Sequence, residues 1–593
     1  MIKKILFAII LLMLSSYKIV KAENFFDINL ESSYEFNKQG NCYIKDTFEI
    51  TNKYTEKYLP SFEYTIKNTD ITNVSVEYGE KTLLPIVQND STSINVKINF
   101  DDKVLGKGNK RTFSILYEIK NLASKTGDVW ELSIPRNEDI KTYSNFKTTL
   151  IVPQAFGKEA YITPNYYEKN IEDEKIIYVF NKEDLLNSRI VIGFGDYQIF
   201  NFIINFHLQN KGTFAESQTI SIPPDTSYQR MYYISIEPKP INIDVDNDGN
   251  WLAKYKVPAN SELNIKATGN VQLFANPRKY LTPPIQNLYE NIKQTTYWQS
   301  NDDNIVNLSK TLKGPEDFYK YVTENLSYDY SLSKTERLGA VKALSNNNNS
   351  SCREYTDLLI ALLRAKGIPA REIIGYAYTD NPNLKPISFY NDVLHSWVEY
   401  WDSEKKIWVS VDPTWGATSK SDYFSKFDLR HFAFTIHGVN DSTPTPAGFY
   451  NSESSDKDIF INFGTLENTP EVSPGVTNNT SNLYLFGRDN VISIKNNNNF
   501  ALYDKNIKYY YDSDLIYEDN IKIIPPHSEV TKHLKSKFSP LAIKTPSSIT
   551  VLVNDKTIKF KGPKYVDLFS QLIVIFLIII ILSIRIIIKH KNK

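Results

Sequence analysis

The stretch 350–367 reads SSCREYTDLLIALLRAKG and decides the fold around it. Ser350 or Ser351 is a suitable N-cap, and Pro369 disfavours continuation of a helix past Gly367. The apolar residues between these signals recur with helical spacing, at positions 355, 358, 359, 362 and 363. The pattern therefore predicts a helix that begins at Cys352.

A cysteine at a helix N-terminus has an unusual electrostatic environment. The unpaired N–H groups and the positive end of the helix dipole favour a thiolate there, and they can also stabilise an oxyanion. This position makes Cys352 a candidate nucleophile. The alternative is a small core hydrophobe, which is the usual role of a buried cysteine.

Two further polar residues lie in a predicted hairpin. The segments 393–401 (VLHSWVEYW) and 406–412 (KIWVSVD) have strand-like composition, and 402–405 forms a polar turn between them. Symmetric pairing about that turn puts His395 opposite Asp412, within reach of a hydrogen bond. Asp412 would then orient His395, which would exchange protons with the thiol and the leaving group.

Taken singly, each of these three residues has an ordinary structural explanation. A lone histidine is usually a satisfied polar residue, and Asp412-Pro413 is a common turn sequence. The coincidence of a helix-start cysteine with the hairpin register of His395 and Asp412 favours a thiol-imidazole-carboxylate triad. Cys352, His395 and Asp412 are therefore the predicted catalytic residues.

Four short motifs together resemble the core of the transglutaminase-like superfamily over about residues 285–440. They are CREY at 352–355, AKGIPAR at 365–371, HSWVE at 395–399 and DPTWG at 412–416. The resemblance implies a papain-like α+β fold with Cys352 as nucleophile, His395 as base and Asp412 as third member. The superfamily includes protein cross-linkers, thiol proteases, deglycosylating amidases and inactive members. One departure is Ser350-Ser351, where members usually have a glycine shortly before the cysteine.

Aromatic residues near these motifs are candidate substrate contacts. Tyr328 lies in a segment, 326–330, that resembles the aromatic stretch upstream of the nucleophile in bacterial members. Strand alternation places Trp397 on the face of His395, and Trp415 follows Asp412. The alternative is that at least two of the four clustered tryptophans, 397, 401, 408 and 415, only fill a sheet core.

The rest of the chain reads mainly as β structure, with alternating strands and turn clusters. We predict a β-sandwich region of one or two domains at 24–198 and a small β domain at 200–275. The catalytic core at 285–440 is followed by a linker at 441–475 that is rich in Ser, Thr, Pro, Asn and Gly. An Ig-like β domain is predicted at 480–560. The fold class is thus multidomain, an α+β papain-like core flanked by all-β sandwich domains.

The two ends of the chain carry membrane signals. Residues 1–22 have a positive head, an apolar run and small residues before a cleavage point, as in a secretory signal peptide. Residues 566–588 are apolar enough for a transmembrane helix, and the tail 589–593 is basic, as a cytoplasmic end should be. The sequence predicts a single-pass cell-membrane protein with its bulk outside.

The composition of the chain argues against several classes of partner and cofactor. Lys+Arg and Asp+Glu are both 68, so there is no net charge to favour nucleic acid. The chain has only Cys42 and Cys352, which excludes a disulfide scaffold. Cys42 is predicted to be a small buried residue in a strand, and the alternative is a regulatory disulfide between the two cysteines. The scattered histidines give no zinc spacing, and no phosphate-binding glycine loop is present. We expect no cofactor and no metal, a protein or peptide substrate, and contacts with cell-wall or surface proteins.

One motif matches the start of a calcium loop. Asp244-Val245-Asp246-Asn247-Asp248-Gly249 has the right spacing, but Tyr255 stands where a calcium loop has glutamate. A β-hairpin closed by Asp248-Gly249 is the preferred interpretation.

Two classes of function remain open. One is a surface thiol enzyme that forms an acyl-thioester from an amide and resolves it with an amine or with water, as a cross-linking enzyme or a peptidase. The other is a non-catalytic binding or adhesion protein that retains the fold. The triad favours the enzyme.

Overall fold

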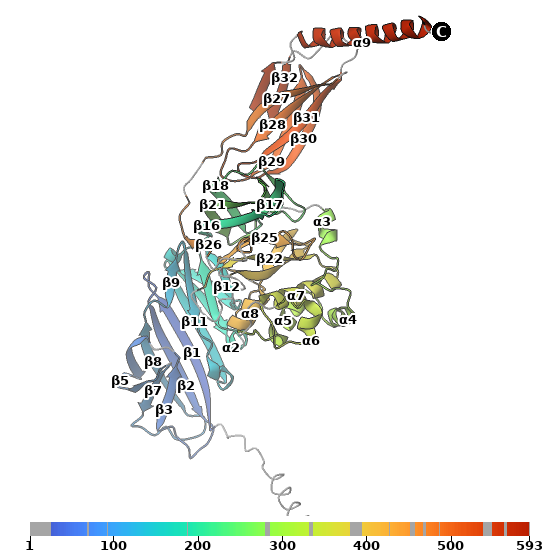
Figure 1. Cartoon of the computed structure of the whole chain (residues 1–593). Coiled ribbons are helices and arrows are strands. Elements are labelled where there is room, and N and C mark those ends of the chain that lie inside the picture. The colour runs from blue at the N-terminus through green and yellow to red at the C-terminus, as the bar shows by residue number, and fades with distance from the viewer. Residues whose placement is uncertain are drawn as a thin grey trace, which may run out of the picture. The chain divides into compact units, whose positions relative to one another are not determined.

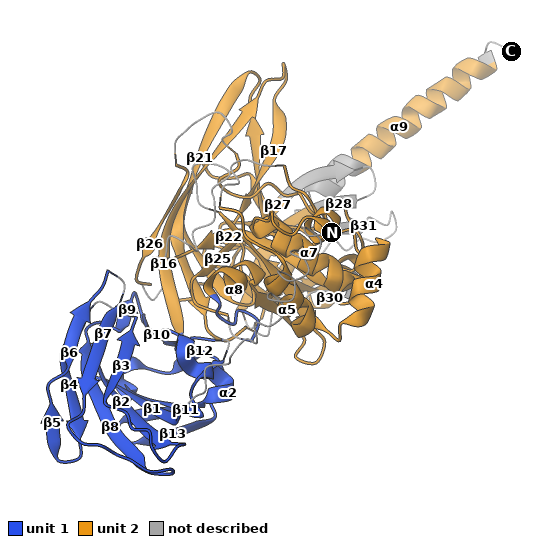
Figure 2. Cartoon of the chain, turned by 90° about the horizontal axis from the view of Figure 1, so that it is seen from below, with its two compact units in different colours: residues 1–196, 420–426 blue, residues 197–419, 427–593 orange. Residues whose placement is uncertain are grey.

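The computed structural model describes residues 25–591 except 68–69, 92, 187, 279–284, 331–335, 380–393, 426, 451–456, 467–469, 485–486, 538–547, 555 and 562–565. The chain divides into two compact units, coloured separately in Figure 2. The first contains residues 1–196 and 420–426, and the second contains 197–419 and 427–593. The predicted signal peptide, 1–22, lies outside the described residues.

The first unit is built from β-strands and short helical turns. Its elements are β1 (Phe26–Phe36), β2 (Cys42–Asn52), β3 (Ser61–Ile66), β4 (Ile71–Tyr78), β5 (Lys81–Leu83), β6 (Ile86–Asn89), β7 (Ile94–Asn99), β8 (Lys110–Ile119), β9 (Ala123–Thr126), β10 (Val129–Ile134), η1 (Glu138–Lys141), β11 (Asn145–Pro153), η2 (Gln154–Phe156), β12 (Glu159–Thr163), β13 (Glu168–Glu172), β14 (Lys175–Asn181), α2 (Lys182–Leu185) and β15 (Ile190–Phe194).

These strands form three sheets around one hydrophobic core. The sheet orders are β13-β14-β11-β1-β2-β8-β4-β5, β12-β15-β10-β9 and β3-β7-β6. Cys42 begins β2 and is 0% exposed in this core, so the prediction of a buried residue in a strand is confirmed. Burial raises the pKa of its thiol well above the usual range, which leaves Cys42 a poor nucleophile.

The second unit begins with a smaller β region (Figure 1). Its strands are β16 (Tyr197–Asn210), β17 (Glu216–Ile222), β18 (Gln229–Glu237), β19 (Asn242–Val245), β20 (Trp251–Val257) and β21 (Ser261–Phe274). They form sheets of order β18-β21-β16-β26 and β17-β20-β19. β26 (Ile459–Phe463) lies within the segment predicted as a linker, 441–475, and pairs antiparallel with β16.

The preferred hairpin is present at the calcium-like motif. β19 pairs antiparallel with β20, with Val245 opposite Trp251. The Asp246 carboxylate accepts the N–H groups of Asp248 and Asn250, each at 2.9 Å. The motif therefore stabilises the turn of this hairpin, because these side-chain to backbone hydrogen bonds close the loop.

The predicted catalytic core consists of helices followed by an antiparallel sheet. The helices are α3 (Ile285–Glu290), α4 (Asp303–Thr311), α5 (Pro315–Asn325), α6 (Ala340–Ser345), α7 (Cys352–Ala365) and α8 (Pro413–Ser419). The strands β22 (Ala370–Ala377), β23 (His395–Asp402), β24 (Ile407–Val411) and β25 (His431–His437) have the order β24-β23-β22-β25. Helix α7 packs against β22 and β23, which gives the predicted α+β arrangement.

Helix α7 begins where the sequence predicted. Ser351 is the N-cap, and its side chain accepts the Arg353 N–H at 3.3 Å. Glu354 returns a capping-box bond, since its carboxylate accepts the Ser351 N–H at 2.9 Å. The helix ends before Gly367, which has a φ of 80° that a residue with a Cβ adopts at a cost.

The hairpin β23–β24 has a different register from the predicted one. Glu399 pairs with Ser410, and Val398 pairs with Val411, so the direct opposition of His395 and Asp412 is wrong by two residues. The turn occupies 403–406 instead of 402–405, because the Asp402 carboxylate accepts the N–H groups of residues 404 and 405. Side chains alternate with a period of two, so His395 stays on the predicted face.

The C-terminal β region has two sheets, of order β27-β28-β31 and β30-β29-β32-β33. Its strands begin at Gly475 and end at Lys561, so the region begins five residues before and ends one residue after the predicted bounds of 480–560. Its strands are β27 (Gly475–Tyr484), β28 (Gly487–Lys495), β29 (Leu502–Tyr511), β30 (Asp514–Ile524), β31 (Glu529–Lys537), β32 (Ser548–Val553) and β33 (Lys556–Lys561). Helix α9 (Val566–Lys591) follows, and its segment 572–590 is long and apolar enough to cross a membrane.

We expect Ser351→Ala to lower the free energy of unfolding by about 1 kcal/mol, because the first turn of α7 loses its cap. Denaturant titration of the detergent-solubilised full chain, with hydrogen exchange of the α7 amides as the readout, measures this change. Ser345→Ala is the control, since Ser345 is exposed at the end of α6. Equal α7 protection in the two variants would contradict the capping role.

Candidate active site

Cys352 is the first residue of α7, and only 3% of its surface is exposed. The N–H groups in the first turn of a helix lack carbonyl partners within the helix and carry partial positive charge. A sulfur or oxygen anion beside Cys352 is therefore stabilised by the helix end.

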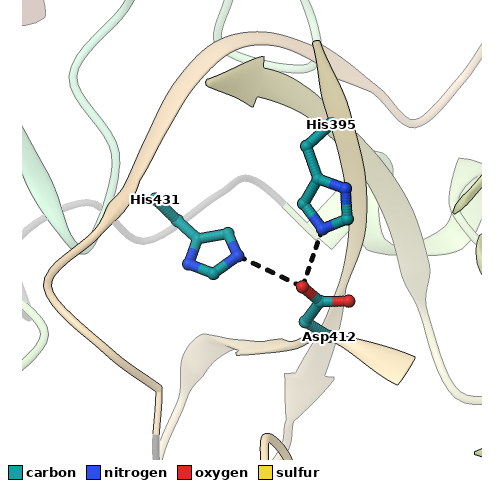
Figure 3. Close-up of side chains that lie close together, drawn as sticks. All are labelled: His395, Asp412 and His431. Carbon is teal, nitrogen blue, oxygen red and sulfur yellow. Dashed lines mark hydrogen bonds and ion pairs between the residues drawn. The ribbon is translucent and has the colours of Figure 1, made fainter. Parts of the chain in front are cut away.

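His395 and Asp412 lie together at the ends of the core strands. His395 begins β23, and Asp412 lies between β24 and α8. The His395 Nε2 and the Asp412 Oδ2 are 2.7 Å apart, as Figure 3 shows. The other oxygen, Oδ1, accepts the N–H groups of Thr414 and Trp415 at 2.9 and 3.0 Å. Asp412 is thus held by the start of α8 while it binds the imidazole.

The second ring nitrogen of His395 is left for the thiol. Among the side chains that the structure describes, no group within hydrogen-bond geometry pairs with His395 Nδ1, which is buried. The Cys352 thiol nevertheless interacts with this ring strongly enough to raise its pKa. Because Asp412 occupies Nε2, Nδ1 is the atom available for proton exchange with sulfur.

A second histidine joins the same carboxylate. The Nε2 of His431 is 3.2 Å from Asp412 Oδ2, and its Nδ1 is 2.7 Å from Asp428 Oδ1 (Figure 3 shows the first contact). Sequence reasoning missed His431 and Asp428. Their only signal is a three-residue separation before a strand, which is too common to indicate a site without the fold.

The charges in this cluster stabilise one another. Burial disfavours the imidazolium of His395, but Asp412 and Cys352 outweigh it and raise its pKa to about 9. Burial likewise opposes the charge on His431, and Asp428 and Asp412 raise the pKa to about 9. Burial alone would raise the pKa of Asp412, yet His395 and His431 hold it far below its usual range. Asp412 is therefore a carboxylate at any physiological pH.

A buried polar network fixes the helix against the sheet. Ser396, next to His395 on β23, donates its one hydroxyl proton to Glu372 Oε1 at 2.8 Å, and its Oγ lies 3.2 Å from Thr356 Oγ1, from which it can accept. Thr356 lies one helical turn after Cys352 on α7, and Glu372 lies on β22. These bonds set the separation of the thiol and the imidazole, because they connect the two elements that carry them.

The three predicted substrate contacts differ in exposure. Tyr328 is half-buried and bridges to Ser350, close to the start of α7. Trp397 and Trp415 are 2% and 1% exposed, and their rings stack on His395 with centroids 6.1 and 5.4 Å away. The two tryptophans thus pack around the imidazole, and contact of all three residues with substrate stays a prediction.

The same cluster also meets the spacing of a metal site. The ligand atoms of His395, Asp412 and His431 lie within 4.8 Å of one another. Their separations of 2.7 and 3.2 Å are those of direct hydrogen bonds. We therefore assign the three side chains to a hydrogen-bonded chain.

A family model of the transglutaminase-like superfamily matches residues 301–413. This match contains Cys352, His395 and Asp412, so this part of the chain is a transglutaminase-like domain. His431 and Asp428 lie beyond it.

Two curated relatives match parts of the chain. The uncharacterized protein YebA of Bacillus subtilis is 26% identical over 195 residues, which are 31% of this chain and 25% of YebA. A protein-glutamine gamma-glutamyltransferase of Pseudomonas aeruginosa is 38% identical over 73 residues, which are 12% of this chain and 11% of the relative. The matches thus span a quarter or less of either relative.

Solved structures with some likeness include a candidate cysteine protease from Cytophaga hutchinsonii. It is 18% identical with a TM-score of 0.33, and the match covers 46% of this chain and 94% of that one. The periplasmic domain of TgpA from Pseudomonas aeruginosa, bound to ethylmercury, is 16% identical with a TM-score of 0.24 over 38% of this chain and 92% of that one. These TM-scores are too low to support a conclusion.

In a protein with Cys42→Ser, we expect Cys352 to react with iodoacetamide well below the ordinary thiol pKa of about 8.5. A thiolate paired with the His395 imidazolium is reactive at neutral pH, and His395→Ala removes that pairing. The measurement is the labelling rate as a function of pH, with Cys352→Ser as the control for labelling elsewhere. An unchanged pH dependence without His395 would contradict the thiol-imidazole pair.

Proposed function

We propose that the transglutaminase-like domain of this chain is a cysteine acyltransferase that acts on side-chain amides of proteins or peptides. The observation that carries the proposal is the 2.7 Å contact of His395 Nε2 with Asp412 Oδ2, which leaves Nδ1 for the Cys352 thiol. A nucleophile, a base and an orienting carboxylate in this order are the requirements for acyl transfer through a covalent intermediate.

The first half-reaction forms a thioester. The Cys352 thiolate adds to the amide carbonyl carbon, and a C–S bond forms as the carbonyl electrons move to oxygen. N–H groups at the start of α7 stabilise this oxyanion. His395 gives its Nδ1 proton to the amide nitrogen as the C–N bond breaks, and a primary amide releases ammonia.

The second half-reaction resolves the thioester. An amine or water adds to the carbonyl carbon and transfers a proton to His395 Nδ1. The C–S bond then breaks, and its electron pair returns to the sulfur of Cys352. An amine yields a new amide, whereas water yields a carboxylic acid. Both routes restore the thiolate-imidazolium pair.

The choice of a side-chain amide rests on the Pseudomonas relative, whose name specifies the γ-glutamyl group of protein-bound glutamine. The nearest alternative is a cysteine peptidase, in which the leaving group is a main-chain amine. A non-catalytic binding or adhesion protein is less consistent with the site. Buried ionisable groups destabilise a fold unless they are fully paired, and a binding module has no need for such a chain.

We place this chemistry at the cell surface. A single-pass anchor formed by α9 would leave the bulk of the chain outside and a short basic tail in the cytoplasm. The substrates would then be surface or cell-wall proteins. The β regions before the catalytic core would present or bind these partners.

We expect the full chain in detergent to attach a fluorescent primary amine to a glutamine-containing protein, with release of ammonia. Cys352→Ala should abolish the product because the thioester cannot form. Asp412→Asn should lower kcat/KM about a hundredfold or more, because the imidazole loses its orienting charge. Cys42→Ala is the matched control and should keep full activity, since Cys42 is buried in the first unit.

The products separate the alternatives. Cleaved peptide bonds without amine attachment would identify a peptidase. Turnover that survives Cys352→Ala would refute the assigned nucleophile. A thiol that forms no acyl product with any amide tested would favour the binding protein.

The membrane assignment predicts that the full chain stays in the pellet when membranes are washed with alkaline carbonate. Replacing Ile579 and Ile580 in α9 by Lys should release it, since each buried charge costs about 2.5–3.5 kcal/mol at the centre of a membrane helix. The same two positions changed to Leu form the control. Retention of the Lys variant would argue against a spanning helix.

A further inference from the structure

His431 has both ring nitrogens against carboxylate oxygens. Nε2 lies 3.2 Å from Asp412 Oδ2 and Nδ1 lies 2.7 Å from Asp428 Oδ1, and the side chain is 0% exposed. A carboxylate only accepts hydrogen bonds, so both nitrogens must donate. A neutral imidazole has one donor nitrogen, whereas the imidazolium has two. The geometry therefore makes His431 a buried cation.

Aromatic rings surround this cation. The centroids of Phe427, Trp415 and Trp397 lie 4.5, 4.6 and 5.0 Å from that of His431. Such ring contacts stabilise positive charge in a site without water.

We propose that His431, held by Asp428, is a positioning residue that fixes the orientation and the charge of Asp412 for His395. The five side chains then form a row of alternating charge, from the Asp428 carboxylate through His431, Asp412 and His395 to the Cys352 thiolate. This proposal rests on the thiol chemistry proposed above and extends the triad by two residues.

The row has two separable effects on His395. The hydrogen bond from His431 keeps Asp412 Oδ2 directed at the His395 ring. The positive charge of His431, whose ring centroid is 5.7 Å from that of His395, also repels a second proton there. His431 thus weakens the hold of Asp412 on the His395 proton, and His395 can both release and recover a proton during turnover.

The charged groups that act on the two rings come from three segments of the chain. Asp412, between β24 and α8, contacts both rings, and Cys352 on α7 acts on His395. Asp428, which precedes β25, contacts His431. Burial would raise the pKa of Asp428, but His431 and, more weakly, the neighbouring Arg430 hold it below its usual range. Asp412 and Asp428 stay ionised between pH 6 and 8, because the pKa of each carboxyl is held below its usual range.

The test uses chloroacetate, an anionic alkylating reagent, on the full chain in detergent with Cys42→Ser and EDTA in every buffer. The His395 imidazolium attracts the reagent carboxylate, so the rate of Cys352 alkylation rises as the thiolate forms and falls as His395 loses its proton. The falling limb therefore reports the pKa of His395, which lies at about 9. No substrate is needed, so the readout does not depend on the acyl donor.

We expect His431→Gln to move the falling limb to higher pH, on the order of one unit, because a neutral donor replaces the cation beside Asp412. Asp428→Asn should do the same, since His431 without its carboxylate becomes neutral at lower pH. Asp428→Glu keeps the charge and should restore the limb of the parent. If His431→Gln fails to fold, the comparison of Asp428→Asn with Asp428→Glu still tests the proposal.

His437→Gln is the matched control. His437 lies on β25 like His431, is 2% exposed and contacts a carboxylate, Glu372 Oε2, at 3.3 Å. His437 has no contact with Asp412, so the falling limb of the His437→Gln variant should coincide with that of the parent. EDTA excludes a metal ion as the source of any shift.

The outcomes separate the two proposals. Coincident falling limbs in the parent, His431→Gln and Asp428→Asn would overturn the positioning role and leave the proposed enzyme intact. A limb that moves equally in Asp428→Glu and Asp428→Asn would also overturn it, because packing rather than charge would then be responsible. A parent without any falling limb would overturn both proposals.

Discussion

The Asp412 carboxylate is the group on which the rest of the site depends. One oxygen accepts two backbone N–H groups at the start of α8, and the other accepts from His395 and His431. Four hydrogen bonds leave it one orientation and one charge state in a place that water does not reach. The strand β24, the helix α8 and both imidazoles are therefore positioned relative to a single buried anion.

Such an arrangement is favourable only when its charges alternate. An isolated buried ion costs several kcal/mol, whereas paired and hydrogen-bonded ions recover most of that cost. The proposed row from Asp428 to Cys352 would satisfy this condition. The network of Ser396, Thr356 and Glu372 holds α7 at a fixed distance from β23. That distance must bring the Cys352 thiol within reach of the His395 ring for the proposed row to form.

Much of the site was predictable from local patterns. The N-cap at Ser351 and the apolar spacing of 355–363 locate Cys352 at a helix start, and both features act within a few residues. Strand alternation placed His395 on the correct face. The register was wrong by two residues because Asp402 and Lys406 shape the turn, with a φ of 55° at Lys406. The hydrogen bonds of the Asp402 side chain and the backbone conformation of Lys406 set the hairpin register, which the assumption of a symmetric turn did not predict.

The sequence by itself determined an apolar C-terminal helix and the four motifs of a transglutaminase-like core. The helix follows from composition, and the motifs follow from a family resemblance that short runs of neighbouring residues carry. Only the tertiary structure brought His431 and Asp428 to Asp412, and only it paired β26 with β16 across more than two hundred residues of chain. Contacts between distant segments depend on how the strands assemble into sheets, and no local pattern encodes that assembly.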